Sequence, residues 1–244
     1  MQIEGKVALV TGANRGIGKA FADALFERGA SKVYAAVRDP SSVTDPRLVP
    51  VQLDVTDTEG IARLATELTD VELVVNNAGI GQVGTLLDSS LDAARQQLET
   101  NYLSILSMTQ AFAPVLARNG GGAFVNVLSV ASWIASPILT TYAASKAAAW
   151  SYTNAARVVL KGDGTHVVGV HVGFVDTDLT AGLQTDKIAP AAVAAAALDA
   201  LEANEPEAVV DDYSRAVKAG LSDDQRTLYP QVEEQYLALA GQAS

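Results

Sequence analysis

Two side chains near the middle of the chain have the types and the spacing needed for proton transfer. Tyr142 and Lys146 are four residues apart, which places them on one face of a helix. A phenol with an ordinary pKa of about 10 exchanges protons poorly at neutral pH, but a neighbouring ammonium favours the phenolate and lowers that pKa. Ser129, at the end of an apolar segment, could hold a substrate oxygen beside the phenol. The pattern predicts an acid–base site, although such a pair alone more often lies on the solvated surface.

The segments that carry these residues alternate between two kinds. Short apolar runs rich in β-branched residues are separated by longer alanine-rich runs along the chain. Near-continuous apolar strands need cover on both faces, and crossover helices supply it. We therefore expect an α/β fold with a doubly wound parallel sheet of about seven strands in three α/β/α layers. The helices of most interest are expected near Leu91 to Arg118 and Thr141 to Leu160. A helical segment is expected from Pro190 to Ala203, followed by a last strand over Ala208 to Val210.

The first apolar segment leads into a glycine-rich turn. Gly12, Gly16 and Gly18 stand between this strand and an amphipathic helix. Glycine permits the tight turn, the approach of backbone to a pyrophosphate and close packing of helix on sheet. The position favours a dinucleotide-binding loop over a plain turn, so residues 1–244 are expected to form one NAD(P)-binding Rossmann-type domain. The predicted cofactor contacts in the turn are Gly12, Asn14, Arg15, Gly16, Ile17 and Gly18.

The end of the second apolar segment bears on the choice of cofactor. NAD sites usually have an acid here for the ribose hydroxyls, but Ala36–Val37 occupies the candidate positions. Arg38 follows, and together with Arg15 it could bind a 2′-phosphate in bidentate fashion. NADP is therefore favoured over NAD. The alternative is that both arginines are surface residues and that Asp39 turns inward.

Asp54 follows the third apolar segment, where two roles are open to it. Its carboxylate can accept a hydrogen bond from the adenine amino group, or it can cap the helix that follows. Asp57 is the other candidate for the cap.

Six motifs then occur together: TGANRGIG, LDVTD, NNAG, Asn101, Ser129 and YAASK. In their order and spacing the chain resembles the short-chain dehydrogenase/reductase family from about Lys6 to Leu179. The resemblance implies that Tyr142 is the acid in reduction and the base in oxidation, with Ser129 orienting the carbonyl. It also implies that Lys146 holds the nicotinamide ribose and lowers the tyrosine pKa, and that Asn101 positions a water linking Lys146 to solvent. Further predicted cofactor contacts are Arg38, Asp54, Val55, Asn77, Ala78, Gly79, Tyr142, Lys146, Val175 and Thr177.

The chain departs from the family pattern in two places. Val172 stands where members commonly have proline before Gly173, which removes a φ restraint from the loop near residues 174–190, the expected substrate loop. The C-terminal segment lacks the glycine-rich close of many tetrameric relatives. We expect a homo-oligomer, either a dimer or a tetramer.

Apolar side chains near Ser129 indicate the kind of substrate. Trp133, Ile134, Phe174, Leu179 and Leu183 could line a pocket for an apolar ketone or aldehyde, although core or lid packing explains them as well. The predicted substrate contacts are Ser129, Trp133, Tyr142 and Phe174.

The sequence thus predicts an NADPH-dependent carbonyl reductase of the alcohol-dehydrogenase type. One alternative is an NAD-dependent alcohol or polyol dehydrogenase. Another is a nucleotide-sensing or scaffolding protein without turnover, which the presence of all four candidate catalytic groups disfavours. A sugar epimerase or dehydratase would generally need an added substrate domain.

The composition limits the remaining possibilities. A formal charge of -11, from 17 basic and 28 acidic residues, disfavours nucleic acid as a partner. The absence of cysteine excludes thiolate chemistry and is consistent with the cytoplasm, and no apolar run or leader-like segment predicts a membrane span or export. His166 and His171 lack neighbouring ligands at metal spacing, so we expect them to be structural and expect no metal site.

Overall fold

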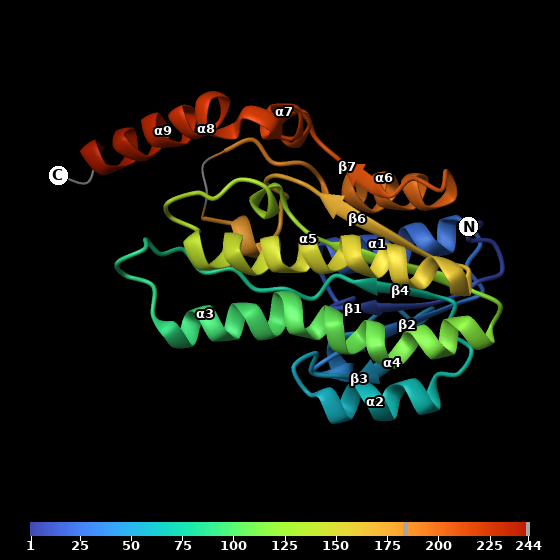
Figure 1. Cartoon of the computed structure of the whole chain (residues 1–244). Coiled ribbons are helices and arrows are strands. Elements are labelled where there is room, and N and C mark those ends of the chain that lie inside the picture. Colours follow the sequence, from blue (N-terminus) through green and yellow to red (C-terminus); the bar gives the residue numbers. More distant parts are fainter. Residues whose placement is uncertain (183–184, 243–244) are drawn as a thin grey trace.

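The computed structural model describes residues 1–182 and 185–242, which contain a parallel sheet of seven strands in the order β3-β2-β1-β4-β5-β6-β7 (Figure 1). The predicted doubly wound sheet is thereby confirmed. The last strand begins one residue earlier than expected. The strands are β1 Val7–Thr11, β2 Lys32–Val37, β3 Val49–Gln52, β4 Leu73–Asn76, β5 Gly122–Val127, β6 Thr165–His171 and β7 Glu207–Val209.

Successive strand residues point to opposite sides of the sheet. Because the strands are apolar on both sides, helices cover both faces. In β1, Ala8 and Val10 pack toward α1 and α6, whereas Leu9 packs toward α2, α4 and α5. Figure 1 shows these two helical layers around the strands. The α-helices are α1 Gly16–Glu27, α2 Thr58–Glu67, α3 Leu91–Leu98, α4 Ser104–Arg118, α5 Thr140–Leu160, α6 Pro190–Glu202, α7 Asp212–Gly220, α8 Asp224–Thr227 and α9 Tyr229–Gln242.

The helix expected over 91–118 is interrupted in its middle. Between α3 and α4 the turn η2, Glu99–Leu103, is π-helical. Such a turn inserts one extra residue per turn and is frequent at functional sites. It contains Asn101, whose side chain is fully buried.

The strand order fixes where a ligand can bind. β1 lies between β2 and β4, so the direction of winding reverses between β1 and β4. Open α/β sheets bind ligands outside the carboxyl ends of the strands at this switch point. The glycine turn follows β1 and the NNAG motif closes β4, so both lie at that point.

The C-terminal helices α7, α8 and α9 extend along one side of the molecule, as Figure 1 shows. A small apolar cluster joins them to the turn after β5, through Val130, Ile134, Val217 and Leu228. Within the described part of the chain, no helix is both long and apolar enough to cross a membrane.

Candidate active site and dinucleotide cleft

The glycine turn leaves room for a phosphate group at the start of α1. Gly12 and Gly16 have φ values of +68° and +53°, which side chains other than hydrogen rarely tolerate. A Cβ atom on Gly18 would lie 2.1 Å from the Gly12 carbonyl oxygen, so the helix can approach the turn only with glycine there. Arg15 precedes α1 and gives it no side-chain cap. The first N–H groups of the helix are thus available to a pyrophosphate, which fits a dinucleotide.

The NNAG motif connects this turn to the centre of the site. The Asn77 amide donates to the Thr11 carbonyl at 2.8 Å, and the backbone N–H groups of Asn77 and Ala78 donate to Thr11 Oγ1, each at 2.9 Å. A Cβ atom on Gly79 would lie 3.7 Å from Lys146 Nζ. The predicted contacts of the NNAG motif therefore lie between the glycine turn and the lysine.

The end of β5 and the first turns of α5 bring the three candidate catalytic residues together. Ser129 lies two residues beyond β5 and starts the short helical turn η3, Val130–Ser132, by accepting from the Ala131 N–H at 3.1 Å. Tyr142 and Lys146 lie in the first two turns of α5. Lys146 Nζ is 5.8 Å from the centre of the Tyr142 ring and donates to the Val127 carbonyl at 2.8 Å.

Burial governs the proton affinity of these groups. Lys146 is only 5% exposed, and burial lowers its pKa to about 8. Burial also raises the pKa of Tyr142, while a side-chain hydrogen bond with Ser129 acts in the opposite direction. The direction for Tyr142 is opposite to the one expected from sequence, because the ammonium bonds the Val127 carbonyl and burial has the larger effect.

Asn101 connects the segment after β4 to α5. Its amide nitrogen donates to the Ile80 carbonyl at 2.8 Å and to Ser145 Oγ at 2.9 Å, and its oxygen accepts from the Ile80 N–H at 2.9 Å. Ser145 Oγ in turn donates to the Tyr142 carbonyl at 2.7 Å. The side chain thus holds the helix that carries Tyr142, and the water expected beside Asn101 stays a prediction.

The carboxylates near the end of β2 and β3 are engaged within the protein. Asp39 accepts from the Ser41 N–H at 3.0 Å and from its hydroxyl at 2.7 Å, and these bonds lower its pKa. Asp54 accepts twice from Thr56, and Asp57 caps α2 through the Gly60 N–H. The capping alternative for Asp54 is therefore wrong.

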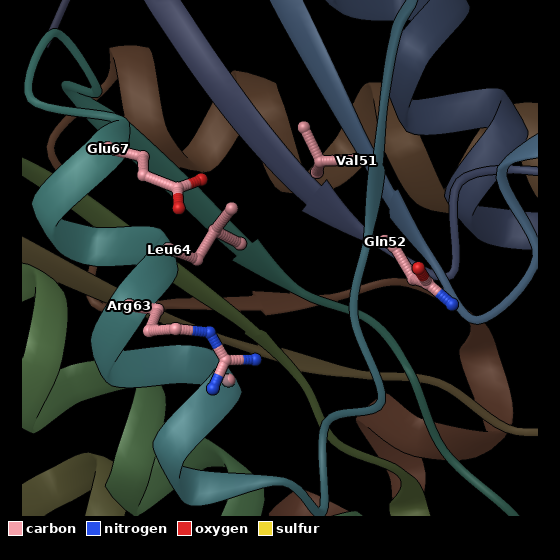
Figure 2. A pocket seen from close by; sticks show the side chains of 6 residues that line it. Val51, Gln52, Arg63, Leu64 and Glu67 are labelled. Carbon is pink, nitrogen blue, oxygen red and sulfur yellow. The ribbon is translucent and has the colours of Figure 1, made fainter.

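Two adjoining clefts lie beside these residues, between the end of the sheet and α2. The larger, of about 430 Å³, is lined by Arg38, Gln52, Leu53, Asp54, Asp57, Gly60 and Arg63. The smaller, of about 350 Å³, lies between β3 and α2, with Arg63, Leu64 and Glu67 on the helix facing Val51 and Gln52 on the strand (Figure 2). Sequence reasoning missed Arg63 and Gln52, although the helical spacing of Gly60, Arg63, Leu64 and Glu67 could have indicated this face.

Arg15 and Arg38 have different surroundings. The Arg15 guanidinium pairs with Asp178 Oδ2 at 2.5 Å, and both side chains are exposed. Asp178 belongs to the turn η5, Asp178–Thr180, beyond β6. Arg38 instead lines the larger cleft. The hydrogen bonds from Thr56 lower the pKa of Asp54, and the charge of Arg38 acts in the same direction.

The remaining predicted cofactor contacts have the following surroundings. Asn14 donates to Ser42 Oγ at 3.2 Å, and Ile17 and Val55 are partly buried against the two core clusters. Thr177 lies beside the glycine turn, since a Cβ atom on Gly16 would be 3.3 Å from its methyl group. Val175 is buried and forms a bridge with Ile188.

The backbone around Val172 is fixed despite the missing proline. Its carbonyl accepts from the Val130 N–H at 2.9 Å and from Ser129 Oγ at 3.4 Å. The Gly173 N–H donates to Asp211 Oδ2 at 2.7 Å. These hydrogen bonds hold the backbone immediately after Val172.

The predicted substrate contacts divide into two groups. A Cβ atom on Gly81 would lie 3.4 Å from the Tyr142 ring and 3.5 Å from Leu179, which places Leu179 near the phenol. Phe174 is partly exposed in the same loop. Trp133 packs instead in the cluster under the C-terminal helices, in line with the alternative of core or lid packing. Leu183 lies outside the described residues.

The comparisons with known proteins cover most of the chain. A family model described as short chain dehydrogenase matches residues 6–188. The 3-oxoacyl-acyl-carrier-protein reductase of Vibrio harveyi is 33% identical over 196 residues, covering 77% of this chain and 80% of the relative. A sorbitol dehydrogenase of Cereibacter sphaeroides is 33% identical over 186 residues, covering 72% and 73%.

A solved structure agrees over nearly the whole length. The short chain dehydrogenase of Burkholderia cenocepacia in complex with NADP is 40% identical, with a TM-score of 0.91 over 95% of this chain and 99% of that chain. The residues matched by the family model, 6–188, include the glycine turn, the NNAG motif, Ser129, Tyr142 and Lys146.

Proposed function

The chain belongs to the short-chain dehydrogenase/reductase family of oxidoreductases, and from this premise we propose that it uses NADPH to reduce a ketone or aldehyde to an alcohol. One observation carries the proposal: Ser129, Tyr142 and Lys146 meet at the carboxyl end of β5, next to the Gly79 backbone of the NNAG motif.

The protonation of these groups suits reduction. NADPH, when bound, supplies a hydride to the carbonyl carbon of the substrate. Tyr142 donates its phenolic proton to the carbonyl oxygen, and Ser129 holds that oxygen by a hydrogen bond. The phenol is protonated at neutral pH, which is the form that an acid requires, and the pKa raised by burial makes it a weaker acid than an exposed phenol. Lys146, with a pKa of about 8, still carries a proton there and can return it to the tyrosine.

Three features of the adenine end support NADP over NAD. The second strand ends in the buried pair Ala36–Val37 and offers no carboxylate to the ribose hydroxyls. Asp39 is held by Ser41, and Arg38 lines the cleft beside it. A guanidinium there suits a 2′-phosphate. The similar Burkholderia cenocepacia structure, which contains NADP, points the same way.

The substrate is proposed to be apolar and to carry a ketone or aldehyde group. Leu179 near the Tyr142 ring and the partly exposed Phe174 support an apolar pocket. The name of the Vibrio harveyi relative specifies an oxo group, which supports reduction. The similarity to a sorbitol dehydrogenase supports the alternative, an NAD-dependent polyol dehydrogenase. Homo-oligomerisation and a cytoplasmic location stay predictions.

A substrate panel tests the proposal. Ketones, aldehydes, alcohols and polyols are each mixed with the enzyme and either NADPH and NADH or their oxidised forms, and the nicotinamide absorbance is followed. We expect the fastest change with NADPH and an apolar ketone or aldehyde. Polyol oxidation with NAD alone would favour the alternative, and cofactor binding without any turnover would contradict both.

A further inference from the structure

His171 is a fully buried histidine next to the candidate active site, and the proposed mechanism does not use it. It is the last residue of β6 and has no exposed surface. Its Nδ1 atom lies 3.0 Å from Ser132 Oγ and 3.3 Å from the Ser129 carbonyl oxygen. Ser129, which carries the candidate catalytic hydroxyl, precedes and caps the short turn η3, and Ser132 ends this turn.

The hydrogen bonds of this turn determine which imidazole nitrogen carries hydrogen. Ser132 Oγ donates to the Ser129 carbonyl at 2.5 Å, so its single hydrogen is already used. Its bond with His171 therefore needs a donor at Nδ1. In the neutral ring Nε2 then has no hydrogen. This atom is buried, has no hydrogen-bond partner among the described residues, and lies 3.6 Å from Glu207 Oε1.

The flat face of the imidazole stacks against a tryptophan. The rings of Trp133 and His171 are stacked, with centroids 3.7 Å apart and an angle of 14° between their planes. The charged groups facing this stack are Glu207 in β7 and Lys218 in α7, which form an ion pair, and Lys218 Nζ lies 5.7 Å from the Trp133 ring centre. Burial lowers the pKa of His171, so the imidazole stays neutral around pH 7.

We propose that His171 is a positioning residue. It holds the Ser129 hydroxyl in place by donating from Nδ1 to the segment Ser129–Ser132 and by stacking against Trp133. The proposal rests on the proposed function, because the hydroxyl it positions is the one assigned to the substrate carbonyl. Loss of the imidazole hydrogen bonds would let the turn shift, and small displacements of a reacting group slow catalysis strongly.

Two substitutions separate the hydrogen bonds from the packing. His171→Asn places an amide where Nδ1 lies, whereas His171→Phe keeps a ring beneath Trp133 and removes the bonds. We expect His171→Phe to lower kcat about tenfold or more with the KM for NADPH unchanged, and His171→Asn to recover most of that loss. His166→Asn is the matched control, since His166 Nε2 contacts the Glu205 carbonyl and not the turn.

Kinetic results can overturn the proposal in two ways. The first is a His171→Phe enzyme with the kcat of the wild type. The second is a folded His171→Asn enzyme whose kcat is as low as that of His171→Phe. A wild-type enzyme without turnover on the whole panel would instead refute the proposed function.

The hydrogen on Nδ1 can be measured without any turnover. The chain has two histidines, so His166→Asn leaves His171 as the only one. Long-range ¹H–¹⁵N spectra of that variant should show a protonated Nδ1 and an unprotonated Nε2 at neutral pH. A proton on Nε2 with a bare Nδ1 would overturn the assignment, even if His171→Phe fails to fold.

Discussion

Lys146 has a positive charge in the protein interior. Replacing it with methionine should show how much that buried charge lowers the free energy of unfolding. Methionine has a similar length and no charge. Burial moves the lysine pKa from 10.5 to about 8. At about 1.4 kcal/mol for each pKa unit, the difference corresponds to about 3 kcal/mol of unfolding free energy.

The sign follows from proton binding in the two states. Below about pH 8 the lysine is charged in both states, and the folded state bears the whole cost. Between about 8 and 10.5 the folded state loses its proton first, so the unfolded state binds more protons and stability rises with pH. Relative to Lys146→Met, the wild type should therefore gain about 3 kcal/mol across this window.

Urea unfolding of both proteins without cofactor, in steps from neutral pH to about pH 10.5, measures this difference. Groups that titrate in both proteins cancel in the comparison. Lys161→Met, at an exposed site after α5, is the control and should show no such change. If the difference in unfolding free energy between wild type and Lys146→Met stays constant over the whole pH range, burial does not lower the pKa of Lys146.

The other predictions concern catalysis, cofactor choice and the glycine turn. Tyr142→Phe should lower kcat about a hundredfold or more, because the acid is lost, while NADPH binding measured by fluorescence titration stays unchanged. Equal turnover would exclude Tyr142 as the acid. Arg38→Ala should weaken NADPH about tenfold or more and leave NADH nearly unaffected, and equal losses for both would contradict a 2′-phosphate contact. Gly18→Ala should abolish dinucleotide binding or unfold the protein in a thermal melt, since its Cβ atom would lie 2.1 Å from the Gly12 carbonyl oxygen. Gly162→Ala is the control, because nothing lies within 4 Å of its new Cβ atom. A Gly18→Ala protein with the same melting temperature and dinucleotide affinity as Gly162→Ala would contradict the close packing of α1 on the glycine turn.

Local patterns in the sequence were sufficient to predict the sheet and the glycine turn. Alternating apolar and alanine-rich segments specify strands and covering helices, and the positions of Gly12, Gly16 and Gly18 specify the turn between β1 and α1. Tyr142 and Lys146 share a helical face because of their spacing alone. These features depend on residues close in the chain, so sequence reasoning can reach them.

Other features depend on partners distant in the chain. The Lys146 ammonium donates a hydrogen bond to the carbonyl of Val127, 19 residues away, and no sequence pattern around the lysine predicts that partner. The pKa of Tyr142 depends on burial, which the complete fold determines. His171 was predicted to be structural, and only the folded chain reveals that it contacts the turn of Ser129.

The contact between Arg15 and Asp178 links the start of α1 to the loop beyond β6, 163 residues later in the chain. Both side chains are exposed, and such pairs contribute only about 0–1 kcal/mol, less as salt is added. A dianionic ligand arriving at the guanidinium would therefore compete with Asp178 at little energetic cost. A phosphate bound by Arg15 would therefore leave the Asp178 carboxylate without this ion pair.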